Sequence, residues 1–360
     1  MRKLFVIILI LSASIPSISF AQEIDLPETS YVSGTIINTY ENENGLALYT
    51  TELRDGSYVE VDSFGEILSV GNRIFLEYFP REDTYNFVTV NRSMPLALLT
   101  IIFVVAIILL SQKKGVRSLA SLALSLGLLL FGLIPLLIYG YDPIVVTVIF
   151  GLLVLGMSIF VTHGFNYQSL VSFIGSVASI LVAIILLYLV QHTASLTGLI
   201  NDEIQFLSFE LKGTLDLVQI VSASIIVGIL GVLDDITITQ VSVVRELSAH
   251  SDNDNKAIFT KALRVGRDHI SSLVNTLVFA YVGATLPMIM FITLLEIPFM
   301  ILISQEFIFI EIIRSLIGAV ALTLAVPVTT WLASFVFIKH IRRDQVSIES
   351  ACGHSHHEHV

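Results

Sequence analysis

The chain has 360 residues, of which 54% are hydrophobic and only 14% are charged. Together with a mean hydropathy of +0.84, this composition indicates a chain solvated largely by lipid and predicts an integral membrane protein. The formal net charge is −11, and the exported part described below has no basic stripe, which argues against nucleic-acid binding. A single cysteine excludes an internal disulfide framework.

The N-terminus has the pattern of a secretory signal peptide. Arg2 and Lys3 precede an apolar run at residues 4–10, and Ser19-Phe20-Ala21 forms a small-x-small cleavage pattern before Gln22. We therefore assign residues 1–21 to a signal peptide. The alternative is an uncleaved anchor, which would add an eighth span.

Residues 22–92 are predicted to form a small extracytoplasmic β domain. Five runs show the alternation and the β-branched or aromatic content of strands, and Gly with Asn or Asp separates them; the runs are 31–39, 46–53, 57–62, 73–79 and 85–91. Five short strands favour an OB-like barrel. This domain holds 13 acidic and 4 basic residues, a net charge of −9, which would either concentrate cations near a pore or keep the surface soluble.

Seven apolar stretches then follow, each long enough for a hydrocarbon core of about 30 Å. They lie at 95–111, 118–138, 143–162, 170–190, 217–244, 270–294 and 315–338. The fold class is thus an α-helical polytopic membrane protein with about seven transmembrane helices in residues 93–343, and lipid is its first partner. Before the last span, Glu311 and Arg314 are three residues apart and are expected to pair on a helix that lies in the membrane interface.

Basic residues orient the bundle. They cluster on one side of the seven-span scheme, opposite residues 22–92, at Lys113, Lys114, Arg117, Arg245, Lys256, Lys261, Arg264, Arg267, Lys339, Arg342 and Arg343. The positive-inside rule places this side in the cytoplasm of a bacterium and the N-terminal domain outside. The 162–169 loop should also be cytoplasmic, yet it has no Lys or Arg.

The stretch 218–247 is the most informative, because it is apolar enough to enter a membrane and yet contains the adjacent acids Asp234 and Asp235. Intramembrane acids are costly and are usually functional. Steps of three or four residues from Asp235 connect small and polar residues into one stripe along the helix: Ser224, Gly228, Gly231, Asp235, Thr239, Ser242 and Glu246. Such a stripe should face protein or water, and Asp235 is expected to bind a cation or relay a proton. The competing interpretation is that the two acids lie at the cytoplasmic interface, where they cap a helical segment or compensate the charge of nearby Lys and Arg.

A second polar set begins the next span. Asp268, Ser272, Asn275 and Thr276 follow one helical side. Packed against the first stripe, they would line a shared site of oxygen donors, the ligand set that Mg²⁺, Mn²⁺ or Ca²⁺ prefers. The alternative is that these side chains only hydrogen-bond across helices as packing contacts.

These two segments carry a family resemblance. The stretches GILGVLDDITITQVSVVREL at 228–247 and VGRDHISSLVNTLVFAYVGATLPMIM at 265–290 resemble the YibE/F family of bacterial multispanning membrane proteins. The resemblance implies an exported N-terminal segment followed by the spans, and it assigns no activity. Family members commonly have a single Asp after a similar glycine pair, so both acids stay candidates here.

Residues 344–360 are predicted to be a cytoplasmic His-rich tail. Four histidines and the cysteine fall within eight residues, at Cys352, His354, His356, His357 and His359. Such a run binds Zn²⁺, Ni²⁺ or Cu²⁺ readily. An incidental polar terminus is the alternative.

The sequence has no nucleophile elbow, phosphate loop, HExxH or paired-cysteine redox motif, so we do not expect an enzyme. The leading hypothesis is a transporter or permease for a small polar solute, with a divalent metal ion as the favoured cargo and the chain as a candidate homo-oligomer. The runner-up is a membrane scaffold or sensor whose exterior β domain binds a partner.

Overall fold

The computed structural model describes residues 30–41, 47–63, 65–211, 213, 215–249 and 255–352, with the side chains of 338–352 left aside. The predicted signal peptide and the histidines of the tail lie outside the described residues. The chain divides into two compact units between residues 105 and 106, and each is considered by itself.

The first unit contains an antiparallel sheet of five strands, β1 (Ser30–Glu41), β2 (Ala47–Leu53), β3 (Tyr58–Asp62), β4 (Arg73–Phe79) and β5 (Thr84–Val90). Their order is β3-β2-β1-β4-β5, and the edge strands β3 and β5 also contact each other. This confirms a small β domain, and the order is compatible with a partly open barrel.

Alternating side chains explain how this sheet closes around a core. Ile36, Tyr49, Val61, Ile74 and Leu76 point inward and are almost fully buried. The β2–β3 connection turns at Asp55, whose carboxylate accepts hydrogen bonds from the backbone N–H and the hydroxyl of Ser57. These bonds favour the ionised form and lower the pKa of Asp55.

The second unit is helical. It contains most of α2 (Ser93–Leu128), which begins in the first unit and is followed directly by η1 (Leu129–Leu133) and α3 (Ile134–Ile138). The further elements are α4 (Pro143–His163), α5 (Tyr167–Ala194), α6 (Asp202–Glu210), α7 (Leu217–Ala249), α8 (Asn255–Leu294), α9 (Phe299–Ser304) and α10 (Glu306–Cys352). Within the described residues, six helical segments are long and apolar enough to cross a membrane. The mostly helical class is therefore confirmed and is compatible with a polytopic membrane protein, while the number of spans depends on how the first segment is divided.

That first segment, residues 93–138, is broken at Gln112. Its backbone there has φ 48° and ψ −127°, which no helix allows. A Cβ built on Gly115 would lie 2.6 Å from the carbonyl oxygen of Ile107, although eight residues of straight helix would separate the two by about 12 Å. The chain therefore folds back on itself at Gln112.

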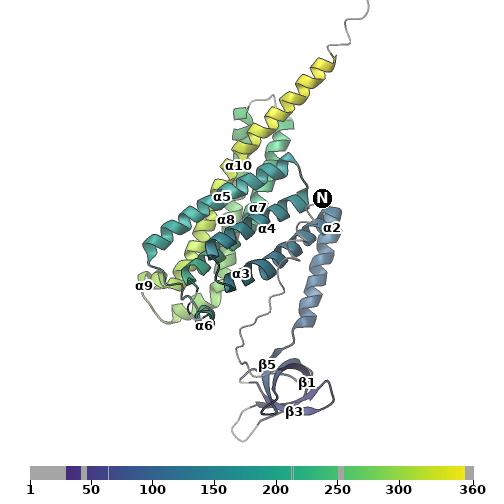
Figure 1. Ribbon diagram of the computed structural model, residues 1–360, viewed down its shortest axis with the longest axis vertical. Helices are drawn as coiled ribbons and strands as arrows, with labels where there is room; N and C mark the ends of the chain where they lie inside the picture. Colours follow the sequence, from purple (N-terminus) through teal and green to yellow (C-terminus); the bar gives the residue numbers. More distant parts are fainter. Residues whose placement is uncertain are drawn as a thin grey trace, which may run out of the picture. The chain divides into compact units, whose positions relative to one another are not determined.

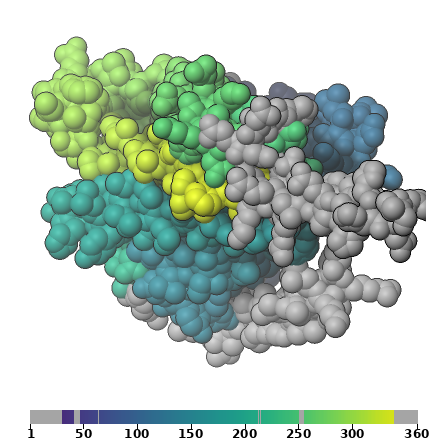
Figure 2. Space-filling view, turned by 90° about the horizontal axis from the view of Figure 1, so that it is seen from above, coloured from purple at the N-terminus to yellow at the C-terminus, as the bar shows by residue number. Residues whose placement is uncertain are grey.

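α7 is the central helix of the second unit. It packs against α4, α5, α8 and α10 (Figure 1). Its apolar side chains, among them Ile229, Leu233 and Ile236, form the main core with α5 and α10. Figure 2 shows α10 lying between α5 and α8 on one face of the bundle. Four helices thus surround α7, and they decide which of its polar groups are covered.

The last helix is longer than hydropathy predicts. It begins at Glu306 and continues to Cys352, whereas the apolar stretch spans only 315–338. Helix propensity and the ion pair between Arg314 and Glu311, whose atoms lie 2.9 Å apart, extend it beyond the apolar part. The predicted pairing of these two residues is confirmed, but it lies on the spanning helix and not on a separate interfacial one.

The fold-back at Gln112 makes Gly115 a position that tolerates no side chain. We expect Gly115→Ala to lower the free energy of unfolding by about 1–3 kcal/mol, because the new methyl group meets backbone and not a flexible side chain. Thermal unfolding of the purified protein measures this. Gly127→Ala is the matched control on the same segment, since nothing lies within 4 Å of its Cβ, and it should be neutral or stabilising by up to about 1 kcal/mol. Equal effects of the two variants would contradict the fold-back.

Candidate functional site

The two adjacent acids of α7 lie in different environments. Asp234 faces α4 and is half-buried, and the hydroxyl of Ser158 donates a hydrogen bond to its carboxylate. Asp235 is exposed, because adjacent helical residues point about 100° apart. The structure therefore separates an acid held by a neighbouring helix from an acid whose side chain is exposed.

The predicted stripe runs along the exposed side of α7. Six of its seven members are exposed, and Thr239 is half-buried. From Ser224 to Glu246 the stripe covers 23 residues, a rise of about 33 Å, which matches a hydrocarbon core of about 30 Å. It lies between α4 on one side and α8 on the other, where a Cβ on Gly228 would lie 2.9 Å from the Tyr281 hydroxyl. A polar surface of membrane length is thus left open on the single chain.

The second predicted set lies on α8. Asp268, Ser272, Asn275 and Thr276 are all exposed. The two helices are antiparallel, with Ala262 beside Gln240 and Tyr281 beside Gly228, so the set lies at the depth of Asp235. No hydrogen bond joins these four side chains to Asp235 in the described structure, and the Thr276 hydroxyl donates within α8 to the Ser272 carbonyl. The two sets share a level of the bundle without forming a closed site.

The opposite side of α7 carries a buried polar network that the sequence does not single out. Thr237 and Ser176 share a hydrogen bond of 2.8 Å between their hydroxyls. Gln240, which is fully buried, donates to the Ala262 carbonyl at 3.0 Å and to the Thr330 hydroxyl at 2.7 Å. These bonds fasten α7 to α5, α8 and α10, and they fix the rotation that turns Asp235 outward.

One end of the stripe, beside the N-terminus of α7, meets a cation. The Arg314 guanidinium donates to the Ser224 hydroxyl at 3.1 Å and pairs with Glu311. It also lies 5.8 Å from the centre of the Tyr281 ring, within the range of a cation–π contact. Arg314 is therefore held by three neighbours, one of which belongs to the stripe.

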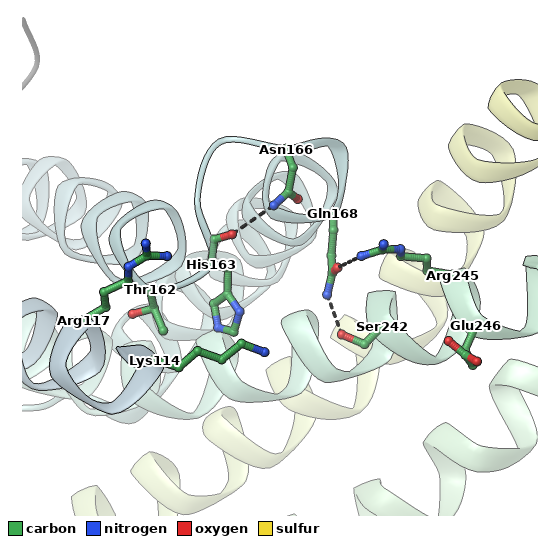
Figure 3. Close-up of a pocket in the computed structure, with 9 residues that line it drawn as sticks. All are labelled: Lys114, Arg117, Thr162, His163, Asn166, Gln168, Ser242, Arg245 and Glu246. Atoms are coloured by element: carbon green, nitrogen blue, oxygen red, sulfur yellow. Dashed lines mark hydrogen bonds between the residues drawn. The ribbon is translucent and has the colours of Figure 1, made fainter. Parts of the chain in front are cut away.

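The other end of the stripe opens into a polar pocket of about 520 Å³ (Figure 3). The ends of four helical segments line it, with Lys114 and Arg117 from α2, Thr162 and His163 from α4, Asn166 and Gln168 at the start of α5, and Ser242, Arg245 and Glu246 from α7. Ser242 and Glu246 also belong to the stripe. The pocket and the stripe therefore share one helical surface.

Hydrogen bonds position the side chains of this pocket. Arg245 donates to the Gln168 side-chain oxygen at 3.0 Å, and the Gln168 amide donates to the Ser242 hydroxyl. Asn166 caps α5 by accepting from the Ser169 N–H at 2.9 Å, and its amide donates to the His163 carbonyl at 3.0 Å. Figure 3 shows the bonds of Gln168 with Arg245 and Ser242 and the bond between Asn166 and His163, and it shows the His163 ring beside the Lys114 side chain.

The sequence assigned Lys114, Arg117 and Arg245 only to orientation. One sequence feature could have pointed to this pocket: the 162–169 loop has no Lys or Arg, although the positive-inside rule expects basic residues there. In the structure this loop contributes Asn166 and Gln168, and the cations beside it come from α2 and α7. The basic residues that this loop lacks are thus supplied by helices distant in sequence.

Within the described residues, no group of three or more His, Cys, Asp or Glu lies close enough to hold a metal ion. The metal site predicted at His354, His356, His357, His359 and Cys352 lies outside the described side chains. That interpretation stays a prediction.

Comparison with known proteins supports the family resemblance. The family model described as YibE/F-like protein matches residues 99–339, which include both quoted stretches, so the chain belongs to the YibE/F-like family. No curated protein and no solved structure matches the chain.

The bond between Gln240 and Thr330 tests whether the buried network holds α7 in place. We expect Thr330→Ala to lower the free energy of unfolding by about 1–2 kcal/mol, since it removes an acceptor from a fully buried amide. Thr323→Ala is the matched control, because both threonines donate within α10 to the carbonyl four residues earlier but Thr323 is exposed. Thermal unfolding of both variants decides, and a Thr330 effect no larger than that of Thr323 would remove the network's role.

Proposed function

We propose that this YibE/F-like protein is a membrane transporter for a small polar solute, which moves along the exposed stripe of α7. The observation that carries the proposal is the stripe itself, because it has the length of the hydrocarbon core and the exposed Asp235 near its middle. A charged side chain open at that depth is costly unless a solute, a proton or water meets it.

The residues of the stripe have different roles in this proposal. Asp235 binds the cation or proton, because its carboxylate is exposed. Asp234 is a positioning residue, since the Ser158 hydroxyl holds it against α4. Gly231 presents bare backbone with open space beside it, which lets a solute approach α7 closely, whereas Gly228 leaves room for the Tyr281 hydroxyl. Thr239 and Ser242 supply hydroxyl oxygens toward the pocket.

A divalent cation is the favoured cargo. Asp235 lies level with Asp268, Ser272 and Asn275 of α8, and all four present oxygen atoms on exposed surfaces. Hard cations such as Mg²⁺ take oxygen ligands and usually keep several waters, so they need no closed cage of protein ligands. The acidic N-terminal domain would raise the local concentration of such a cargo.

The same proposal includes seven spans. The break at Gln112 divides residues 93–138 into two helices, and five further segments follow. An odd number of spans places the N-terminal β domain and the C-terminal tail on opposite sides. The basic residues around the pocket assign its side to the cytoplasm.

The second candidate is a scaffold or sensor whose β domain binds a partner. The observation in its favour is the set of exposed large side chains on that domain, namely Tyr31, Tyr58 and Ile67, of which Ile67 is 97% exposed. A partner that binds this domain would cover such side chains, because contact surfaces form where large apolar groups lie together. Under this function the α7 acids would have no part in the activity.

Substitutions of the two acids should affect metal transport to different extents. Asp235→Asn removes the charge and keeps the size, so we expect the cell's content of the cargo metal to change as far as it does when the gene is deleted. Asp234→Asn should be milder, because an amide oxygen still accepts the Ser158 hydrogen bond. The measurement is the cellular content of Mg, Mn, Ca and Zn in strains that accumulate equal amounts of each variant.

Asp202→Asn on α6 serves as the matched control, because it removes an exposed carboxylate outside the stripe. If metal contents are the same with and without the gene, the divalent cargo is wrong. If wild-type function, measured by complementation, survives both α7 substitutions, the scaffold function becomes the better one.

The topology has its own test. Cys352 is the only thiol of the chain, so a membrane-impermeant maleimide should label it only after the cells are permeabilised. Labelling of intact cells would contradict seven spans with a cytoplasmic C-terminus. The control is Ile67→Cys in a Cys352→Ser background, since Ile67 is exposed on the β domain and should react in cells whose outer layers admit the reagent.

A further inference from the structure

We propose that the pocket at the C-terminal end of α7 binds a phosphate-bearing anion. Three permanent cations from two helices line it, Lys114 and Arg117 from α2 and Arg245 from α7. Its volume of about 520 Å³ falls within the range of about 300–1,000 Å³ that small-molecule sites occupy. This site does not depend on the transport function, because no step of it involves Asp235.

The charge of the lining favours a dianion. Three cations and the single carboxylate of Glu246 leave a formal charge of +2 with His163 neutral. A phosphomonoester or inorganic phosphate carries about −1.5 to −2 at neutral pH, so it balances this charge, whereas a lone carboxylate leaves one cation uncompensated. Lys and Arg are also the side chains most used for phosphate recognition.

The pocket is partly preorganised for such a ligand. Gln168 holds Arg245 at 3.0 Å and is itself bonded to Ser242, so less side-chain freedom is lost when Arg245 meets an anion. The Thr162 hydroxyl and the Asn166 side chain add neutral polar groups to the lining. Asn166 also begins α5, a helix of 28 residues whose N-terminus favours negative charge.

The positive-inside rule by itself does not explain this arrangement. Orientation requires only that basic residues lie on one side of the membrane. Lys261, Arg264 and Arg267 of α8 satisfy it as exposed residues outside the pocket. Lys114, Arg117 and Arg245 instead converge on one cavity from helices that are more than 100 residues apart in sequence.

Two sources offer the same chemistry at this place. A pocket at the end of the spanning helices can receive the phosphate of an anionic lipid headgroup, or it can receive a soluble phosphate from the aqueous side. In either case the ligand would touch α2, α4, α5 and α7 at once, and it would therefore stabilise the folded bundle.

The test uses the full chain purified in an uncharged detergent, with thermal unfolding followed by the fluorescence of Trp331, the only tryptophan. Inorganic phosphate is titrated against chloride at constant ionic strength, and in a second arm phosphatidylglycerol is compared with phosphatidylcholine. We expect one of these anions to raise the melting temperature, as binding to the folded state requires. Stabilisation by inorganic phosphate assigns the site to a soluble anion, and stabilisation by phosphatidylglycerol alone assigns it to a headgroup.

Matched variants connect the effect to the pocket. Lys114→Gln with Arg117→Gln and Arg245→Gln should weaken the apparent affinity about tenfold or more, because charge-assisted hydrogen bonds are lost. Lys261→Gln with Arg264→Gln and Arg267→Gln removes the same charge from exposed positions on the same side and should leave the affinity unchanged. If the first triple variant does not fold, Lys114→Gln alone, at an exposed position, carries the test. The proposal is overturned if neither anion stabilises the wild-type protein, or if pocket and control variants respond equally.

Discussion

Polar side chains inside a membrane bundle must find partners within the chain, because hydrocarbon offers them no hydrogen bonds. In this protein that constraint acts on α7. Thr237 bonds to α5, Gln240 bonds to α8 and α10, and Asp234 bonds to α4. The bonds reach different neighbouring helices, so together they fix the rotation of α7 as well as its neighbours. The other helices pack around α7, whose polar side chains would lack hydrogen-bond partners in lipid.

This fixed rotation explains why Asp235 is exposed. Once Asp234 faces α4 and Gln240 faces α8 and α10, the remaining side of α7 carries Asp235. Gly228 and Gly231 lie on the same side toward the N-terminus of α7, and Ser242 lies toward its C-terminus. Two carboxylates that are neighbours in sequence thereby receive different surroundings. A single acid would have to be either held by the protein or available to a solute, whereas the pair allows both at one depth.

Hydropathy predicted the helical class, strand alternation predicted the small β domain, and steps of three or four residues predicted the stripe along α7, because each depends on a local pattern. The predicted spans 95–111 and 118–138 already end and begin on either side of the break at Gln112, but the close approach of Gly115 to Ile107 could not be read from the sequence. Sequence also gave the boundaries of α8 and α10 too short, because helices continue past the apolar part of a span. Which side of α7 each polar residue faces could not be predicted, as it depends on partners such as Thr330, 90 residues away.

The pocket and the stripe share residues of α7, so a ligand in the pocket would also contact one end of the stripe. Ser242 belongs to the stripe, accepts the hydrogen bond of Gln168 and lines the pocket, while Gln168 holds Arg245. An anion bound among Lys114, Arg117 and Arg245 would lie across the end of the stripe that Ser242 and Glu246 form. Because a helix is rigid over the two turns between Asp235 and Ser242, such a ligand would cover this end of the stripe without altering the geometry around the acids.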